Sequence, residues 1–129
     1  GLGCEPEAVL RNRQAWFAVY RDEHQVRALA PDLQALRTLA PLDVVVTAPG
    51  REQDFASRYF WPANGGAEDP VTGSIHAGLA PYWAERLGRN ELVALQASAR
   101  TGILHCRVEA DRVMVAGQAV LYLDGTIEL

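Results

Sequence analysis

The chain has 129 residues, of which 49% are hydrophobic and 22% charged, and its formal net charge at neutral pH is −4. This length suits one domain with a single core, and the acidic balance disfavours binding to nucleic acid or to an anionic membrane. No apolar run is long enough to span a membrane, and no signal peptide is visible. We expect a cytoplasmic protein because Cys4 and Cys106 have no pairing or metal spacing and are predicted to be reduced thiols.

Short helices alternate with apolar strands in the first half of the chain. Runs of β-branched and aromatic residues predict strands, whereas an aspartate or a proline before an apolar stripe predicts the start of a helix. We expect helical segments over 5–10, 22–29 and 32–40, and strands over 15–20, 42–47 and 54–61. In the last strand, Phe55, Tyr59 and Trp61 share one face, and Arg58 and Phe60 share the other.

A loop rich in Gly and Pro leads from these segments to a helix and a β meander. Apolar spacing predicts a helix over 74–87, with Gly88 in its C-terminal cap and a kink at Pro81. Gly117 predicts a bulge or a close backbone approach. We expect strands over 92–98, 102–109, 112–123 and 126–129. The fold class is therefore α+β, with an antiparallel sheet around the 74–87 helix.

The cysteines and histidines do not form a recognisable site. Cys4 and Cys106 lie near opposite ends of the chain, without the spacing of a metal site. We therefore predict that both are reduced thiols that pack in the protein. The three histidines are also scattered along the sequence, and we expect no metal site.

The segment most informative about function is Glu68-Asp69-Pro70-Val71-Thr72-Gly73-Ser74, which ends where the 74–87 helix begins. At such a junction the N–H groups of Gly73, Ser74 and Ile75 have no acceptor within the helix. Together with the helix dipole they form an anion site that suits a carboxylate. Glu68 and Asp69 lie beside this site, and one of them is a candidate general acid or base.

The same segment has a purely structural interpretation. Asp69-Pro70 is an ordinary helix start, with Asp as the N-cap and Pro at the first helical position, and Thr72 or Ser74 could be the cap instead. His76, near the start of the helix, is either a ligand contact or a structural histidine. Gln96 either lines the site or forms a hydrogen bond at a strand end.

The Glu68–Ser74 string, preceded by Arg58-x-Phe60-x-Pro62, closely resembles the signature in the second half of the phenazine biosynthesis PhzF-like family. The similarity continues through His76-Ala77-Gly78-Leu79-Ala80-Pro81-Tyr82-Trp83 and through Gln96-x-Ser98-x-Arg100-x-Gly102. The resemblance implies a diaminopimelate-epimerase-like fold with two lobes, each a curved antiparallel sheet around a central helix, and an active site between them. Residues 1–129 would then be a single C-terminal lobe, with the first lobe absent.

The resemblance also implies a chemistry. Family members are isomerases that transfer a proton on small carboxylated substrates, a dihydroxylated dihydroanthranilate in the phenazine enzyme, without metal or organic cofactor. Asp69 and Ser74 match its catalytic positions, and the amides of Gly73 and Ser74 would hold the substrate carboxylate. Glu68, His76 and Gln96 are the further candidates for substrate binding. The principal acid/base of the family is a first-lobe Glu with no counterpart here, so we expect little or no activity from this chain alone.

The sequence departs from the family pattern at several positions. Thr101 and Ala97 stand where Gly is common, and we expect these changes to alter a turn rather than the chemistry. Thr72 occupies the place of a Cys in related racemases, which argues against two-thiol racemisation. Two other functions stay open: a lobe that forms a homodimer or binds a missing first lobe, and a non-catalytic module that binds a carboxylate at Gly73 and Ser74.

Overall fold

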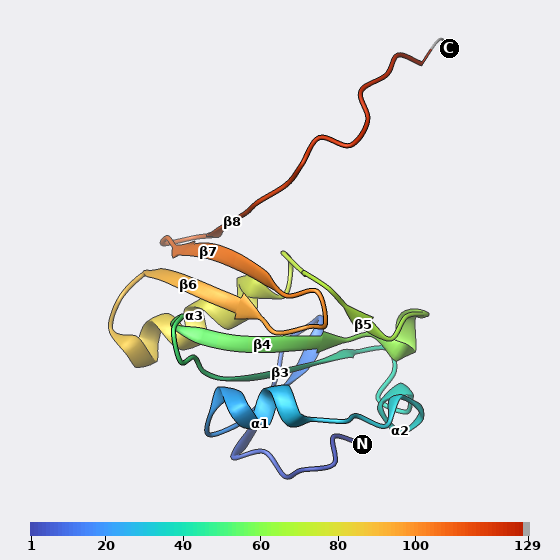
Figure 1. The fold of residues 1–129 in the computed structure, drawn as a ribbon. Coiled ribbons are helices and arrows are strands. Elements are labelled where there is room, and N and C mark those ends of the chain that lie inside the picture. The colour runs from blue at the N-terminus through green and yellow to red at the C-terminus, as the bar shows by residue number, and fades with distance from the viewer. Residues whose placement is uncertain (128–129) are drawn as a thin grey trace.

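The computed structural model describes residues 1–127, which form one mixed sheet of eight strands with helices on both faces (Figure 1). The strands are β1 (Ala8–Arg11), β2 (Ala15–Val19), β3 (Asp43–Pro49), β4 (Phe55–Phe60), β5 (Glu68–Asp69), β6 (Glu91–Gln96), β7 (Gly102–Val108) and β8 (Val113–Gly117). The helices are α1 (Glu23–Ala28), α2 (Leu33–Arg37) and α3 (His76–Leu87), with a 3₁₀ turn η1 (Pro62–Asn64). None of the helices within 1–127 is long and apolar enough to cross a membrane.

The sheet is mixed rather than antiparallel as predicted, because two of its strand pairs are parallel. The strand order is β1-β2-β3-β4-β6-β7-β8, with β5 beside β4. β2 runs parallel to β3, and β4 runs parallel to β6. Each of these connections contains a helix, and such a crossover returns the chain to the same end of the sheet, so the joined strands run in the same direction. The α+β class and the long helix before the final strands are confirmed.

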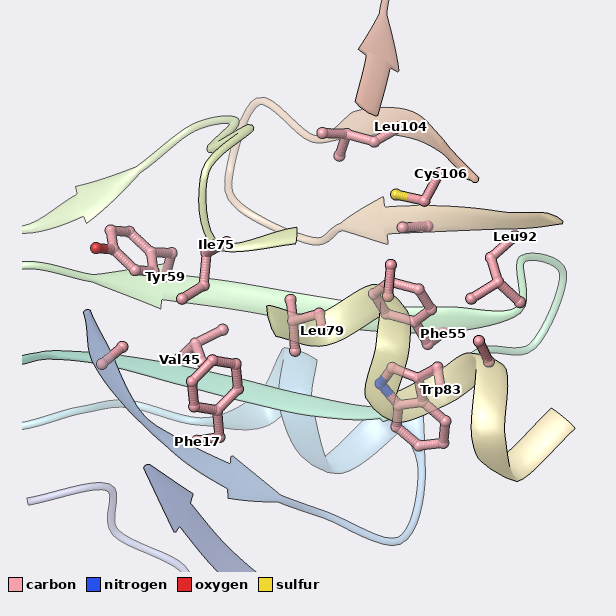
Figure 2. Close-up of a cluster of buried hydrophobic side chains, with 14 residues drawn as sticks. Phe17, Val45, Phe55, Tyr59, Ile75, Leu79, Trp83, Leu92, Leu104 and Cys106 are labelled. Atoms are coloured by element: carbon pink, nitrogen blue, oxygen red, sulfur yellow. The ribbon is translucent and has the colours of Figure 1, made fainter. Parts of the chain in front are cut away.

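Alternating side chains along β4 feed a separate hydrophobic cluster on each face of the sheet. Phe55 and Tyr59 pack on the α3 side, where Leu79 and Trp83 lie by Phe55 and Ile75 lies by Tyr59 (Figure 2). Phe60 lies on the opposite face, in the cluster that includes residues of α1 and α2. The alternation predicted for this strand is therefore confirmed. Because full burial of a large apolar side chain contributes about 1.5–3 kcal/mol, β4 is firmly fixed in the fold.

The helix ends follow the local signals in the sequence. The Asp22 side chain accepts a hydrogen bond from Gln25 N at 2.9 Å, and Asp32 caps α2 in the same way. Gly88 ends α3 with φ 66°, a left-handed conformation that glycine adopts without strain. α3 continues through Pro81, which lies on the exposed side of the helix.

Several predicted segments are wrong. Residues 8–10, predicted as helical, belong to β1, because their backbone pairs with β2. The strand predicted over 112–123 ends at Gly117, which keeps regular register with Leu104, so the predicted bulge is absent there. Residues 118–127 then run away from the body of the molecule (Figure 1), and 126–127 are not a strand. The rest of the predicted 126–129 strand lies outside the described residues.

The two cysteines lie in different surroundings. Cys106 is buried in the α3-side cluster, which confirms its packing role, and burial raises the pKa of its thiol to about 11. Cys4 is exposed, so the packing role predicted for it is wrong. Neither thiol forms a disulfide.

Candidate functional site

The predicted site residues lie where β4, β5 and the start of α3 meet. Asp69 pairs with Tyr59 across the β4–β5 ladder, and the chain then turns through 70–75 into α3. Gly73 and Ser74 are exposed, whereas Asp69 is half-buried. The fold therefore presents the turn at 73–74 to solvent and holds the preceding segment against the sheet.

The backbone N–H groups of Gly73 and Ser74 have no acceptor among residues 1–127. The first bonds at this helix end come from His76 N to Gly73 O at 3.1 Å and from Ala77 N to Ser74 O at 3.2 Å. Ile75 is the N-cap and no side chain caps the helix, so the alternative of a side-chain cap at Asp69, Thr72 or Ser74 is wrong. Open N–H groups at a helix start favour an anion.

Gln96 holds the segment that precedes these open groups. Its side chain is fully buried at the end of β6. Its Oε1 accepts from Thr72 N at 2.7 Å, and its Nε2 donates to Asp69 O at 2.8 Å and to Thr72 Oγ1 at 3.1 Å. Gln96 thus fixes both ends of segment 69–72 from beneath. The substrate contact predicted for it stays a prediction.

His76 holds the same segment from the helix side. It is fully buried, and its Nδ1 lies 2.7 Å from Thr72 O. Because a carbonyl oxygen can only accept, Nδ1 is the protonated nitrogen, and Nε2 has no partner in the described part of the chain. Burial lowers the pKa of His76, so the ring is neutral at pH 7. Its contact with substrate also stays a prediction.

The Asp69 carboxylate is oriented by its own loop. The Thr72 hydroxyl donates a short hydrogen bond to Asp69 Oδ2, while Thr72 Oγ1 accepts from Gln96. Ser98 Oγ adds a bond to Pro70 O at 2.7 Å. The Thr72 side chain therefore fixes the direction of the neighbouring Asp69 carboxylate.

Glu68 points to the other face of the sheet. Successive residues of a strand face opposite sides, so Glu68 and Asp69 do not share one environment. Arg58 donates to both Glu68 oxygens, from Nε at 2.8 Å and from Nη2 at 3.0 Å. Arg58 Nη1 also donates to Leu29 O at 2.8 Å, at the end of α1. This ion pair ties β5 to α1, and the substrate contact predicted for Glu68 stays a prediction.

A chain of polar side chains that the sequence reasoning missed reaches Ser74 from the N-terminal half. Gln14 Nε2 donates to Ser74 Oγ at 2.9 Å and to the Tyr59 hydroxyl oxygen at 3.2 Å. The Tyr59 hydroxyl donates to Asp43 Oδ2, and Asn64 Nδ2 donates to Asp43 Oδ1 at 2.7 Å. Burial and the hydrogen bond to Asp43 raise the pKa of Tyr59 to about 12. The sequence feature that could have revealed these hydrogen bonds is Asp43, a single charged residue in a strongly apolar strand.

This arrangement is suited to binding an anion and exchanging a proton. Two open N–H groups and the Ser74 hydroxyl lie in the same turn, and the oriented carboxylate of Asp69 comes a few residues before them. Within residues 1–127, no three or more His, Cys, Asp or Glu side chains lie together as a metal-binding group.

Comparison with known proteins decides the family. The phenazine biosynthesis-like protein family matches residues 4–125. This chain belongs to that family. An uncharacterised isomerase of Pseudomonas aeruginosa is 49% identical over 128 residues, which are 99% of this chain and 49% of that protein. An uncharacterised isomerase of Halalkalibacterium halodurans is 43% identical over 125 residues, which are 95% of this chain and 47% of that protein.

Solved structures show the same PhzF-like fold. A crystal structure of a PhzF family protein from Enterococcus faecalis superposes with a TM-score of 0.89 at 42% identity, over 95% of this chain and 47% of that one. The resemblance read from the sequence is therefore confirmed at the level of family and fold. The chain spans about half the length of the curated relatives it matches.

Proposed function

We propose that this PhzF-like chain forms one side of the active site of a cytoplasmic isomerase that transfers a proton on a small carboxylated substrate without a cofactor. The observation that supports this proposal is the turn at Gly73 and Ser74, whose N–H groups are open. The oriented carboxylate of Asp69 belongs to the same loop. Family membership supports the reaction class, because relatives over nearly the whole chain are named isomerases.

In this proposal each group has a separate task. The amides of Gly73 and Ser74 and the Ser74 hydroxyl hold the substrate carboxylate through charge-assisted hydrogen bonds, which are roughly twice as strong as neutral ones. Asp69 takes part in the movement of the proton. An isomerisation removes a proton from one carbon and returns it to another, so the site also needs an acid/base group at the reacting carbons. We assign that role to a Glu from another lobe.

We further propose that the complete site forms between two lobes. The second lobe is either another copy of this chain, in a homodimer, or a first lobe that carries the Glu. The chain's half-length match to its relatives supports this idea, as do the exposed apolar side chains of the edge strand β1, Val9 at 57% and Leu10 at 44%. If the partner is a second copy, sedimentation should show a dimer that forms as concentration rises. A clean monomer at high concentration would exclude the homodimer and leave a first lobe as the proposed partner.

The carboxylate site is tested by titrating the ¹⁵N-labelled chain with anthranilate while following the Gly73 and Ser74 amide signals. We expect saturable shifts at these two amides and little turnover of a dihydroanthranilate substrate by the chain alone. Turnover that Asp69→Ala abolishes would overturn the half-site proposal, and absence of any saturable shift would overturn carboxylate binding. Binding that never gives turnover, even with a first lobe added, would instead identify a non-catalytic binding module.

A further inference from the structure

We propose that Gln14 is a positioning residue that fixes the Ser74 hydroxyl as a hydrogen-bond donor toward the bound carboxylate. The inference rests on the proposed function of the Gly73–Ser74 turn and adds a residue from a distant part of the chain. Gln14 lies in the turn between β1 and β2, and 60 positions separate it from Ser74. It does not need to touch the substrate, because it acts through the Ser74 oxygen.

The hydrogen bonds that link Asp43, Tyr59, Gln14 and Ser74 take their direction from the buried Asp43. Asp43 is 9% exposed, and its carboxylate has no hydrogen to donate. The Tyr59 hydroxyl must therefore donate its hydrogen to Asp43 Oδ2, and Asn64 supplies the donor for Oδ1. Once that hydrogen is committed, the Tyr59 oxygen can only accept from its other neighbour, which is Gln14.

This polarity determines which way the Gln14 amide faces. With Nε2 toward Tyr59 and Ser74, the two amide hydrogens serve two acceptor oxygens, at 3.2 Å and 2.9 Å. The reversed amide would place Oε1 against the Tyr59 oxygen, two acceptors with no hydrogen between them. Ser74 Oγ consequently accepts from Gln14, and its own hydrogen remains available for a ligand oxygen.

The backbone of Gln14 is itself held in place. Asn12 Oδ1 accepts from Gln14 N at 2.8 Å and from Ala15 N at 2.9 Å, which forms an Asx turn. The turn also packs directly against α3 at Gly78. A Cβ at Gly78 would lie only 2.8 Å from Phe17 Cζ and 2.9 Å from Asn12 Nδ2. The Gln14 amide therefore reaches Ser74 from a turn that packs on α3, the helix that follows Ser74.

The test measures anthranilate affinity by amide titration in four variants of the full chain. Gln14→Met keeps the length of the side chain but has no N–H group, and Arg13→Met is the matched control in the same turn. We expect Gln14→Met to weaken binding roughly threefold to tenfold, since an oriented donor to a charged oxygen is lost. Arg13→Met should leave affinity unchanged. In a Ser74→Ala background, Gln14→Met should cause no further change in the anthranilate affinity.

Two results would overturn the proposal. Equal weakening by Gln14→Met with and without the Ser74 hydroxyl would show that Gln14 does not act through Ser74. The second readout needs no ligand: the Gln14 side-chain NH₂ signals should shift in Ser74→Ala and in Tyr59→Phe. Unchanged NH₂ signals in both variants would contradict the hydrogen-bond chain. If the wild type binds no anthranilate, the proposed function fails, and these signals alone then decide whether Gln14 orients Ser74.

Discussion

Segment 69–72 and the turn at 73–74 adjoin in the chain but are built in opposite ways. In the segment, Gln96 satisfies the Thr72 N–H and the Asp69 carbonyl, and His76 satisfies the Thr72 carbonyl. In the turn, the N–H groups of Gly73 and Ser74 meet no acceptor within residues 1–127. A binding site needs donors that are unpaired and yet fixed in position, and the paired segment supplies that fixed position.

This difference predicts that mutations in the segment change mainly the stability of the fold, whereas mutations in the turn change mainly the affinity for a ligand. Substitutions beneath the paired segment should change the free energy of unfolding, because they leave buried polar groups without partners. Substitutions in the open turn should change affinity for a carboxylate with little effect on stability, because the side chain there is exposed.

The largest effect is expected for Gln96→Ala. This change leaves Thr72 N–H and Asp69 C=O unpaired and creates a cavity under the loop, so it should lower the free energy of unfolding by about 2–4 kcal/mol. Urea denaturation measures the loss, with the exposed Gln34→Ala as the control. A loss below that of the control would show that segment 69–72 is not held from beneath.

The next effect is a dependence of stability on pH that His76 causes. Its pKa is lowered in the folded protein, whereas the unfolded chain has the ordinary value of 6.5. Below pH 6.5 the unfolded chain therefore binds a proton that the folded protein does not. The stability present above pH 6.5 is lost as the pH falls toward the folded pKa.

Between about pH 7.5 and 5.5 we expect His76 to lower the stability as the pH falls, by no more than the limit of about 1.4 kcal/mol per pH unit for one proton. Urea denaturation at the two pH values should show this slope in the wild type and in His105→Gln, an exposed histidine on β7. The slope should be smaller in His76→Gln. Equal slopes in all three proteins would count against a buried neutral His76.

A smaller effect, in the opposite direction, is expected for Thr101→Gly. Thr101 has φ 58°, and its N–H bonds to Ser98, the residue that holds Pro70. A left-handed backbone strains a residue with a Cβ, so glycine should raise stability by about 0.5–1 kcal/mol. Thermal denaturation can compare it with Thr101→Ala, which keeps the Cβ and should give no gain. Equal midpoints for the two variants would contradict the strain.

The smallest effect on stability is expected for Ser74→Ala, below about 0.5 kcal/mol, because the side chain is exposed. Its affinity for anthranilate should nevertheless fall about tenfold, the loss of one hydrogen bond to a charged group. Calorimetric titration measures this loss, and Thr126→Ala, which removes an exposed hydroxyl beyond β8, serves as the control. A drop in stability with unchanged affinity would reverse the comparison between the two stretches.

Local patterns were enough to predict the elements whose state depends on their own residues. The alternation of Phe55, Tyr59 and Phe60 is visible in the sequence because it follows from the pleat of a single strand. Most of β1 was predicted as helical because its state depends on pairing with β2, which no local pattern shows. The strand predicted beyond Gly117 is wrong for the same reason, since its apolar residues pair with no strand in the described part of the chain.

The candidate site divides in a similar way. Asp69, Gly73 and Ser74 can be named as candidates from the sequence because they lie in one short string that resembles a family signature. Gln96 and His76 were selected as site residues, but the hydrogen bonds that they form to Thr72 depend on the folded position of that residue. Gln14 could not be predicted, because its two partners lie 45 and 60 positions away in the sequence.

Gly78 has a consequence for how this site could be altered during evolution or by design. It contributes no side chain and no donor to the site, yet its lack of a Cβ leaves room for the Phe17 ring and for the Asn12 side chain of the β1–β2 turn. An added methyl group there would lie 2.8 Å from Phe17 Cζ and 2.9 Å from Asn12 Nδ2, so these two side chains would have to move, and the Asn12 side chain also holds the backbone of Gln14. A change at this position would therefore reach the Gln14 amide through Asn12, while every residue of the Glu68–Ser74 string stays the same.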